Sequence, residues 1–552
     1  MSTTHEVINQ STPFVDVNLF DSDRALRDAM NFNQPTLDIR ALSALGAEAG
    51  AADTLAHARL ANVHTPELHT HDRFGHRVDQ VEFHPSYHAL LGAALRHGLH
   101  GAPWTRGAGA HVERAAGFML WTQAEPSVLC PVSMSYAVTP ALRANAPLYD
   151  AWRARIASTQ YDPRFAPLAH KSAVTLGMGM TEKQGGSDVR ANTTRAEPDG
   201  EDDWGTRVRI TGHKWFFSAP MCDAFLVLAQ AKAGLSCYFL PRWLPDGTPN
   251  VLRIQRLKDK LGNKANASSE VEFDRSVAWR VGEDGRGVPQ ILAMGAITRL
   301  DCALGTSGLM RHALVLALHH CRERRAFGKA LIEQPLMRNV LADLALESEA
   351  ATALALRLAR AVDRTESGQD ADGHEALMRR VLTPIAKFWV CKRGSVFAQE
   401  AMECLGGNGY VEERGEGAMA RVYREMPLNS IWEGAGNIMA LDLLRALRTG
   451  PVADALMHEL QPARAANGAL DRLAAGLPSR VDGTTDEAAA RRLARDVALV
   501  MQAALLQQHA PAEVFDTFCA SRLDDQLGGG GAFGLLDARA PLDALVARAL
   551  PH

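Results

Sequence analysis

The 552-residue sequence lacks the marks of several protein classes. Its eight cysteines lie far apart and none belongs to a CxxC pair, which argues against a disulfide framework or a structural zinc site and favours a reducing cytosol. No apolar run approaches the roughly 18 residues needed to span a bilayer. The N-terminus, MSTTHEVINQSTPF, lacks the basic start and apolar core of a secretory signal. We therefore expect a cytoplasmic chain with no membrane partner.

Charge of one sign is also lacking. Lys plus Arg number 59 and Asp plus Glu number 63, so the net charge is −4. This balance excludes a chain dominated by basic character but leaves room for a local basic patch. Residues 452–552 hold nine Arg, no Lys and 13 Asp plus Glu, so this region carries the negative balance of the whole chain.

The middle of the chain differs in texture from its flanks. Residues 206–211 and 271–274 alternate polar and apolar side chains, and residues 224–230 and 235–240 are short apolar runs bounded by turn residues. Period-two alternation with frequent turn residues predicts strands of an antiparallel barrel or sandwich.

The flanking regions are helical in character. Between Pro335 and Gly368 lie 32 residues with neither Gly nor Pro, and a second helical stretch runs over 384–405. Long helices joined by short turns predict a bundle, and the length predicts two to four domains. We expect an α+β, mostly α, fold with an N-terminal helical domain (1–176), a middle β domain (177–285), a helical bundle (286–450) and a C-terminal helical extension (451–552).

The densest glycine and polar cluster is the loop 177–189, with the sequence GMGMTEKQGGSDV. A loop of this kind exposes backbone N–H groups and hydroxyls that can hold phosphate or the polar edge of a flavin ring. Its spacing is neither GxGxxG nor GxxxxGK[ST], so a Rossmann loop and a P-loop are unsupported. An ordinary turn is the alternative.

Other segments also allow two interpretations. The aromatics of 213–220 are either core or, with Ser218, cofactor-facing. The arginines of 322–328 form either a solvated face or a pyrophosphate clamp, and the glycines of 404–410 are either a helix stop or part of a site. Glu433, between Trp432 and Gly434, is either an exposed carboxylate or a base whose pKa desolvation raises.

The joint order of these segments resembles the acyl-CoA dehydrogenase flavoprotein family. The matching motifs are a TEPxAGSD-like loop (181–188), a GxKxWIT-like segment (212–218), RxxFG (324–328), GGNG (406–409) and a YEG-like triplet (432–434). The wording MTEKQGGSDV, GHKWFFS, RLKDKLGN and REMPLNSIWEGAGNIM, with the C-terminal extension, is similar to the AidB-type alkylation-response branch. The resemblance covers nearly the whole chain and is strongest over 175–445.

The resemblance implies an FAD site shared between subunits of a homotetramer. Met180 and Thr181 would lie at the isoalloxazine ring and Ser187 at phosphate, while Phe216 replaces a flavin-packing Trp and Ser218 a ring-contacting Thr. Arg324, Phe327, Gly406 and Gly407 would come from a neighbouring subunit. The complete implied cofactor set is Met178, Gly179, Met180, Thr181, Gly186, Ser187, Phe216, Phe217, Ser218, Arg324, Phe327, Gly406, Gly407, Ile431, Trp432, Gly434, Gly436 and Asn437.

Glu433 takes the position of the family's catalytic base. The resemblance implies that this base removes the proton α to an acyl-CoA thioester while the β-hydrogen leaves as hydride to the flavin, with base and flavin on opposite faces of the substrate. The sequence departs from the family at Trp432, which replaces Tyr, and at Ala435, which replaces a hydroxyl residue. Arg445 would suit an anion at the mouth of the substrate cavity.

In the AidB-type branch, double-stranded DNA binding is attributed mainly to the C-terminal domain, and dehydrogenation is weak. DNA affinity depends on neutralised phosphates, which the net-negative tail does not favour. Arg491, Arg492 and Arg495 are the best candidate contacts in the tail, although three arginines on one helix face also fit a solvated stripe.

Two histidine pairs, His69 with His71 and His84 with His88, have spacings that could bind metal, but no Asp, Glu or Cys set completes a site. We predict no metal. Two functions remain: an FAD-containing, DNA-binding protein of the alkylation response with weak or unknown-substrate dehydrogenase activity, which the AidB-type wording favours, and a genuine dehydrogenase of short or branched acyl-CoAs with Glu433 as base.

Overall fold

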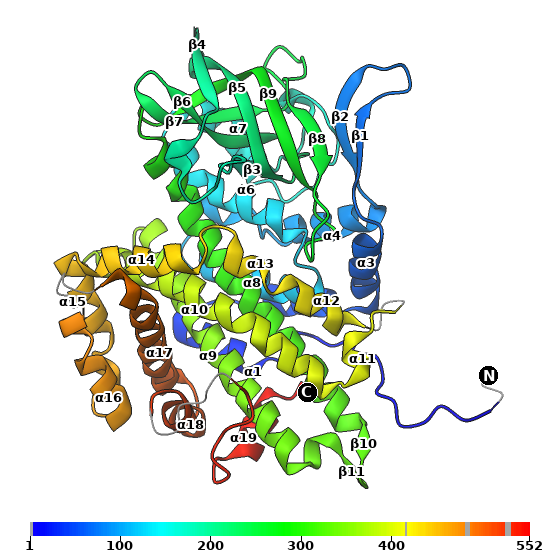
Figure 1. Ribbon diagram of the computed structural model, residues 1–552, viewed down its shortest axis with the longest axis vertical. Helices are drawn as coiled ribbons and strands as arrows, with labels where there is room; N and C mark the ends of the chain where they lie inside the picture. Colours follow the sequence, from blue (N-terminus) through cyan, green and yellow to red (C-terminus); the bar gives the residue numbers. More distant parts are fainter. Residues whose placement is uncertain (1–3, 414–416, 481–485, 525–531, 552) are drawn as a thin grey trace. The chain divides into compact units, whose positions relative to one another are not determined.

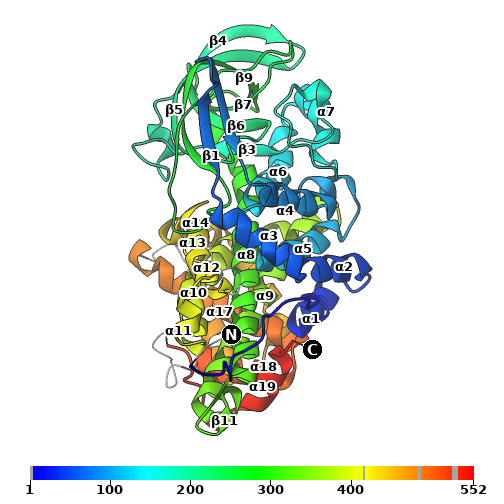
Figure 2. The ribbon, with the colours of Figure 1, turned by 90° about the vertical axis from the view of Figure 1, so that its right-hand side faces the viewer.

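The computed structural model describes residues 4–413, 417–480, 486–524 and 532–551, which form two compact units. One unit contains residues 56–107 and 125–298, and the other contains the rest of the chain. Figures 1 and 2 show the elements of both units. Both helical and β regions are present as the sequence predicts, so the α+β, mostly α, fold is confirmed.

The unit of residues 56–107 and 125–298 is built around a seven-stranded sheet. The strands run in the order β3-β6-β4-β5-β9-β7, β8 pairs with β9, and a further pairing of β6 with β7 closes the sheet. The bounds are β3 Leu176–Gly179, β4 Arg195–Asp202, β5 Gly205–Ser218, β6 Ala224–Ala231, β7 Gly234–Pro241, β8 Arg253–Leu257 and β9 Ser268–Val281. Most pairings are antiparallel, as expected, but β3 pairs with β6 in parallel.

Helices and a separate hairpin complete this unit. They are the end of α3 (Ala52–Val63), the hairpin of β1 (Glu67–His71) and β2 (Arg77–Glu82), α4 (Pro85–Arg96), α6 (Leu129–Leu142), α7 (Ala146–Ile156) and the start of α8 (Gly287–Glu323). Helix α6 contacts β3, the strand that leads into the glycine-rich loop. The strands β6 and β7 are almost wholly buried because their apolar runs form the core.

The other unit is a helical bundle. It contains α1 (Arg24–Asn33), α2 (Arg40–Ala49), α5 (Ala110–Ala124), the rest of α8, the hairpin β10–β11 (Arg325–Ala326 and Lys329–Ala330), α9 (Pro335–Glu366), α10 (His374–Cys404), α11 (Gly407–Tyr410), α12 (Ala418–Glu425), α13 (Leu428–Ile431) and α14 (Gly436–Leu447). The predicted 32-residue helix is present as α9. Helix α10 begins ten residues before Pro384, which lies inside it.

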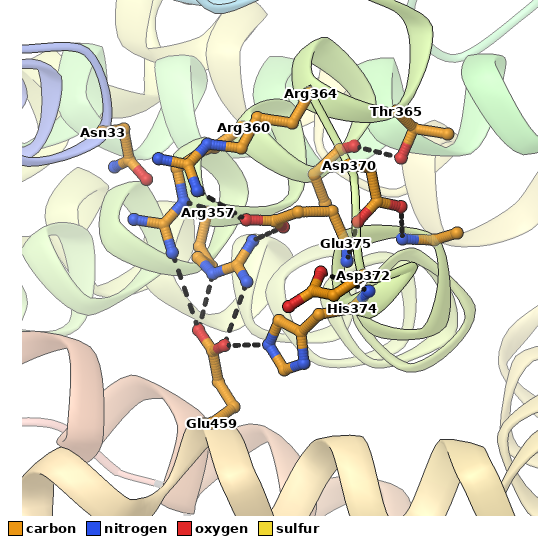
Figure 3. A network of polar contacts seen from close by, with 12 residues as sticks. Asn33, Arg357, Arg360, Arg364, Thr365, Asp370, Asp372, His374, Glu375 and Glu459 are labelled. Carbon is orange, nitrogen blue, oxygen red and sulfur yellow. Dashed lines mark hydrogen bonds and ion pairs between the residues drawn. The ribbon is translucent and has the colours of Figure 1, made fainter. Parts of the chain in front are cut away.

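The C-terminal extension packs onto this bundle. It comprises α15 (Gly450–Glu459), α16 (Gly468–Ala475), α17 (Ala490–His509), α18 (Ala512–Arg522) and α19 (Leu542–Ala549). Helix α17 contacts α9, α10 and α14 (Figure 1). A buried polar network joins α15 to the bundle, because Arg357 of α9 donates to Glu459 of α15 at 2.6 Å and to Glu375 of α10 at 2.7 Å (Figure 3). The extension is thus integrated by charge as well as by apolar packing.

Candidate active site

The glycine-rich loop is hydrogen-bonded to the C-terminal part of β5. The amide of Trp215 donates to the Thr181 carbonyl at 2.8 Å, and the Asn192 side-chain amide donates to the Met180 carbonyl at 2.9 Å. These bonds fix the backbone of Met180 and Thr181 beside the β5 residues that the sequence predicts for the same site.

Glycines of this loop allow close approach. A Cβ on Gly179 would lie 2.5 Å from the ring of Phe217, and one on Gly186 would lie 2.5 Å from the Thr181 hydroxyl. Both separations are shorter than real Cβ contacts, so a larger residue at either position would displace its neighbour. The loop is therefore tightly packed against β5 and against itself.

The three residues at the end of β5 do not share one environment. Phe216 is 51% exposed and Phe217 is fully buried, because the pairing of β5 with β9 is irregular between Lys214 and Phe217. The Phe217 ring packs on Phe225 with centroids 4.2 Å apart. The Phe217 side chain therefore belongs to the core, and its place in the cofactor set stays a prediction that would require a contact through its backbone. The Ser218 hydroxyl lies 3.3 Å from that of Ser268.

A buried ion pair supports the loop from beneath. The Lys214 ammonium lies 2.8 Å from the Glu182 carboxylate, and both side chains are fully buried. Glu182 also accepts from the amides of Thr193, at 2.7 Å, and Thr194, at 3.2 Å. Burial alone would raise the pKa of Glu182, but the Lys214 charge and these hydrogen bonds hold it well below its ordinary value. Glu182 thus anchors the glycine-rich loop to Lys214 and to the backbone of Thr193 and Thr194.

In the bundle unit, Glu433 lies on the tight turn between α13 and α14. Its φ is +61° and that of Gly434 is +106°, so two successive residues adopt a conformation that L side chains rarely take. Ile431 is 63% exposed, and Glu433 is half-buried. The predicted cofactor residues Ile431, Trp432, Gly434, Gly436 and Asn437 lie on or beside this turn.

Two cations bind the backbone of this turn. Buried Lys387 of α10 donates to the carbonyls of Asn429, at 2.6 Å, and Trp432, at 2.7 Å. Arg299 of α8 donates through Nε to the Glu433 carbonyl at 2.9 Å. The carbonyl oxygens of the turn are therefore satisfied by side chains from two other helices.

The residues expected to act in a neighbouring subunit lie on exposed turns. Phe327 is 98% exposed at the tip of the β10–β11 hairpin, with φ +51°. Arg324 donates to the Asn9 carbonyl. Gly406 and Gly407 begin α11, and a Cβ on either would meet nothing within 4 Å. Open space at these glycines is compatible with the approach of a large group.

The arginines predicted to bind DNA or substrate have different partners. Arg445, Arg491 and Arg492 are exposed, and a nitrogen of Arg491 lies 3.1 Å from the position that a Cβ on Gly436 would occupy. Arg495 instead pairs with Asp496 at 2.7 Å, and Asp496 also pairs with Arg480. Arg495 is thus partly neutralised.

The histidine pairs have local partners. His69 contacts Glu82 at 3.0 Å, and His88 contacts the Tyr161 hydroxyl at 2.6 Å. Within the described ranges, no three His, Cys, Asp or Glu side chains gather as metal ligands would. The helices that the structure describes include none long and apolar enough to cross a membrane.

The sequence analysis did not identify the residues that support these segments. Lys387 and Arg299 were not predicted, and neither was the pairing of Glu182 with Lys214. One signal was available: Lys387 is the only charged residue within the otherwise largely apolar run 381–391. An isolated charge in an apolar helix face indicates a buried partner elsewhere in the fold.

Comparison with known proteins shows which family the chain belongs to. The acyl-CoA dehydrogenase middle domain matches residues 177–276, the acyl-CoA dehydrogenase C-terminal domain matches 285–448, and the adaptive response protein AidB N-terminal domain matches 9–163. The AidB protein of Escherichia coli K12 is 45% identical over 95% of each chain. The chain belongs to the acyl-CoA dehydrogenase family.

Within that family it belongs to the AidB-type branch, because the similarity to the Escherichia coli protein extends through the N-terminal domain and the C-terminal extension. Among solved structures, the apo form of Bd2924 has a TM-score of 0.83 at 30% identity, covering 92% of this chain and 100% of that one. Caenorhabditis elegans ACDH-11 in complex with C11-CoA has a TM-score of 0.82 at 25% identity, covering 98% of this chain and 95% of that one.

Proposed function

We propose that this protein binds FAD and dehydrogenates an acyl-CoA-like thioester between its α and β carbons, with Glu433 as the base. The observation that carries the proposal is the Glu433 turn. The backbone of Glu433 is left-handed, and two cations from other helices bond to the backbone carbonyls around it. Strained conformations of this kind persist where the surroundings over-determine them, and they cluster at active sites.

The residues present fit a flavin. Exposed Phe216 offers an aromatic face, Ser218 a hydroxyl, and the glycine-rich loop a fixed row of backbone groups beside them. Members of the acyl-CoA dehydrogenase family use FAD. We infer that Met180, Thr181, Phe216 and Ser218 hold the ring and that Ser187 binds phosphate. A Phe216→Ala substitution should weaken FAD binding about tenfold or more in a titration of the flavin-free protein, since stacking is lost.

When bound, FAD supplies the acceptor for the hydride that leaves the β carbon. The chain itself supplies the base: the Glu433 carboxylate accepts the α proton as the carbon–carbon double bond forms. Its backbone is fixed by Arg299 and Lys387, so the carboxylate starts from a defined position, which is worth much of the rate in a reaction that depends on alignment.

The test is flavin bleaching under anaerobic conditions. C11-CoA and short branched acyl-CoAs should reduce the bound flavin, and a Glu433→Gln variant should do so 100- to 10,000-fold more slowly, the usual range for loss of a general base. Glu513→Gln, an exposed change on α18, is the matched control. Unchanged bleaching by the Glu433→Gln variant would refute the role of Glu433.

We also propose a homotetramer in which Arg324, Phe327, Gly406 and Gly407 complete a neighbour's site. Large apolar side chains on the bundle unit support it, since Phe327 is 98%, Leu336 83% and Tyr410 80% exposed, and such residues mark interaction surfaces. Light scattering should give four times the chain mass of 59.8 kDa. A monomer that binds FAD as tightly as the assembled protein would contradict the shared site.

Double-stranded DNA binding is a second candidate function. Similarity to Escherichia coli AidB through the C-terminal extension supports it, as do exposed Arg491 and Arg492, whereas the pairing of Arg495 with Asp496 weakens it. Duplex affinity should fall steeply with salt. Retention of affinity after deletion of residues 452–552 would exclude the extension as the contact.

The remaining assignments concern setting and organisation. We propose a cytoplasmic location, supported by the eight cysteines, which are all buried and form no disulfide among the described residues. We also keep the division into domains at 176/177, 285/286 and 450/451 as a proposal. A reporter fusion and limited proteolysis test the two.

A further inference from the structure

The Glu433 turn needs external support. A residue other than glycine with φ of +61° is strained relative to ordinary backbone. The short helix α13 ends at Ile431, and α14 begins at Gly436 with no side-chain cap on Ala435. The local bonds found here are those of Trp432, whose amide donates to the Leu428 carbonyl and whose indole donates to the Asn429 side chain.

Lys387 supplies such support from the middle of α10. Its side chain is 1% exposed, and its ammonium donates to the carbonyls of Asn429 and Trp432. Within the described residues, its hydrogen-bond partners are these two backbone carbonyls and no carboxylate. Burial of an ammonium without a carboxylate costs several kcal/mol, so the two carbonyls are the reason that this cation can stay there.

Further bonds tie the same turn to the bundle. Arg299 donates to the Glu433 carbonyl and pairs with Asp442 of α14 at 3.2 Å. The Asn429 side chain accepts from the Trp432 indole at 3.0 Å and donates to the Thr306 hydroxyl at 3.1 Å. Lys387 thus bonds at the start of the turn and again next to Glu433, while Arg299 bonds at Glu433 itself.

The Lys387 and Glu433 charges both act on the thiol of buried Cys302. Burial chiefly raises the pKa of the Cys302 thiol, while the Lys387 charge lowers it and the Glu433 charge raises it. Both charges are therefore felt at one buried sulfur.

We propose that Lys387 is a positioning residue for Glu433 that acts by fixing the carbonyls of Asn429 and Trp432, with Arg299 fixing the next one. This inference rests on the proposed function for its catalytic consequence, but the restraint on the turn can be measured without it.

The first measurement is hydrogen exchange of the FAD-loaded full-length protein. Lys387→Met keeps an unbranched buried side chain and removes the ammonium. Peptides covering 428–437 should exchange about tenfold faster than in the parent, while peptides from α9 stay unchanged. Lys387→Arg should restore much of the protection, because it returns a cationic donor. Gln399→Met, at an exposed position on the same helix, is the matched control.

The second measurement is flavin reduction by C11-CoA. Lys387→Met should slow the reduction step about 10- to 100-fold with less than a threefold change in half-saturation, because misplacement of the base affects alignment and not binding. Lys387→Arg should recover most of the rate. Should Lys387→Met not fold, Arg299→Gln tests the same restraint, since Asp442 keeps a second arginine, Arg380, at 3.8 Å.

The outcomes separate the two proposals. Faster exchange confined to 428–437 supports the restraint, and unchanged exchange in both Lys387→Met and Arg299→Gln overturns it. If Glu433→Gln stops flavin reduction but Lys387→Met leaves it intact, the positioning role is wrong and the proposed function stands. If Glu433→Gln reduces flavin at the parent rate, the proposed function fails, and the exchange data alone decide whether Lys387 holds the turn.

Discussion

Two buried lysines, one in each unit, support a candidate segment in different ways. Lys214 pairs with the carboxylate of Glu182 beneath the glycine-rich loop, whereas Lys387 bonds only to carbonyl oxygens beneath the Glu433 turn. Both residues are 1% exposed. One lysine is thus neutralised by a side chain of the loop it supports, and the other binds backbone alone.

The difference matches what each segment has to present. The glycine-rich loop needs a fixed backbone, so its own carboxylate can serve as an anchor that also accepts from Thr193 and Thr194. The Glu433 turn carries the carboxylate proposed to react. A cation that bonds to the carbonyls can hold that turn without taking the reactive carboxylate as its hydrogen-bond partner.

The largest expected loss of stability follows from substitution of Lys214. Lys214→Met leaves Glu182 charged and buried, which should lower the free energy of unfolding by about 3–5 kcal/mol and weaken FAD binding. Urea unfolding followed by fluorescence measures the first and a flavin titration the second. Lys183→Met, at an exposed neighbouring position, should change stability by less than about 0.5 kcal/mol.

A double substitution sharpens the result. In Lys214→Met with Glu182→Met, no unpaired charge remains, so more than half of the lost stability should return. A double variant as unstable as Lys214→Met would show that packing, and not the orphaned carboxylate, causes the loss.

Glu459 tests a third arrangement, in which a buried arginine has two carboxylate partners (Figure 3). Burial would raise the pKa of Glu459, but Arg357, His374 and Arg360 lower it to about 2. Because the folded pKa lies below the ordinary 4.5, the stabilisation is complete above pH 4.5 and disappears as the pH falls towards 2. It amounts to about 3 kcal/mol at roughly 1.4 kcal/mol per pKa unit.

The measurement compares urea unfolding of the parent and Glu459→Gln at pH 7 and pH 3. The stability difference between the two proteins should be largest at pH 7 and clearly smaller at pH 3. A difference independent of pH would mean that the Glu459 charge does not stabilise the fold.

The sequence predicted the elements that depend on local residue patterns. The loop 177–189, the β5 strand and the long helix α9 all follow from glycine content, alternation or the absence of breakers. It did not predict that α10 continues through Pro384, because the packing of α10 against α9 and the bonds of Glu375 to Arg357 outweigh the lost backbone hydrogen bond.

The orientation of side chains was harder to foresee than the position of elements. Phe216 and Phe217 look equivalent in the motif, and only the irregular pairing of β5 with β9 shows which one is exposed. Lys387 pairs with carbonyls 42 and 45 residues away, and no local pattern encodes a bond to a distant backbone oxygen. Contacts between segments far apart in sequence are what the fold adds.

Lys387→Met should cost less global stability than Lys214→Met. It removes two charge-assisted hydrogen bonds but leaves no buried carboxylate, so we expect a loss of about 1–3 kcal/mol, measured by the same urea unfolding. No second substitution of a carboxylate should rescue it, in contrast to Lys214. A loss equal to that of Lys214→Met would erase the distinction between the two lysines.

The smallest expected effect is at the surface of the extension, where Arg491, Arg492 and Arg495 are exposed. Arg495 already pairs with Asp496, which Arg480 also contacts, so Arg495→Ala should hardly change duplex DNA affinity. Arg491→Ala with Arg492→Ala removes two exposed charges and should reduce the slope of log affinity against log salt by about two if both contact phosphate. An arginine paired with Asp496 cannot neutralise phosphate as fully as two arginines without that neighbour. If Arg495→Ala therefore changed duplex affinity as much as Arg491→Ala with Arg492→Ala, the proposed contact would lie elsewhere.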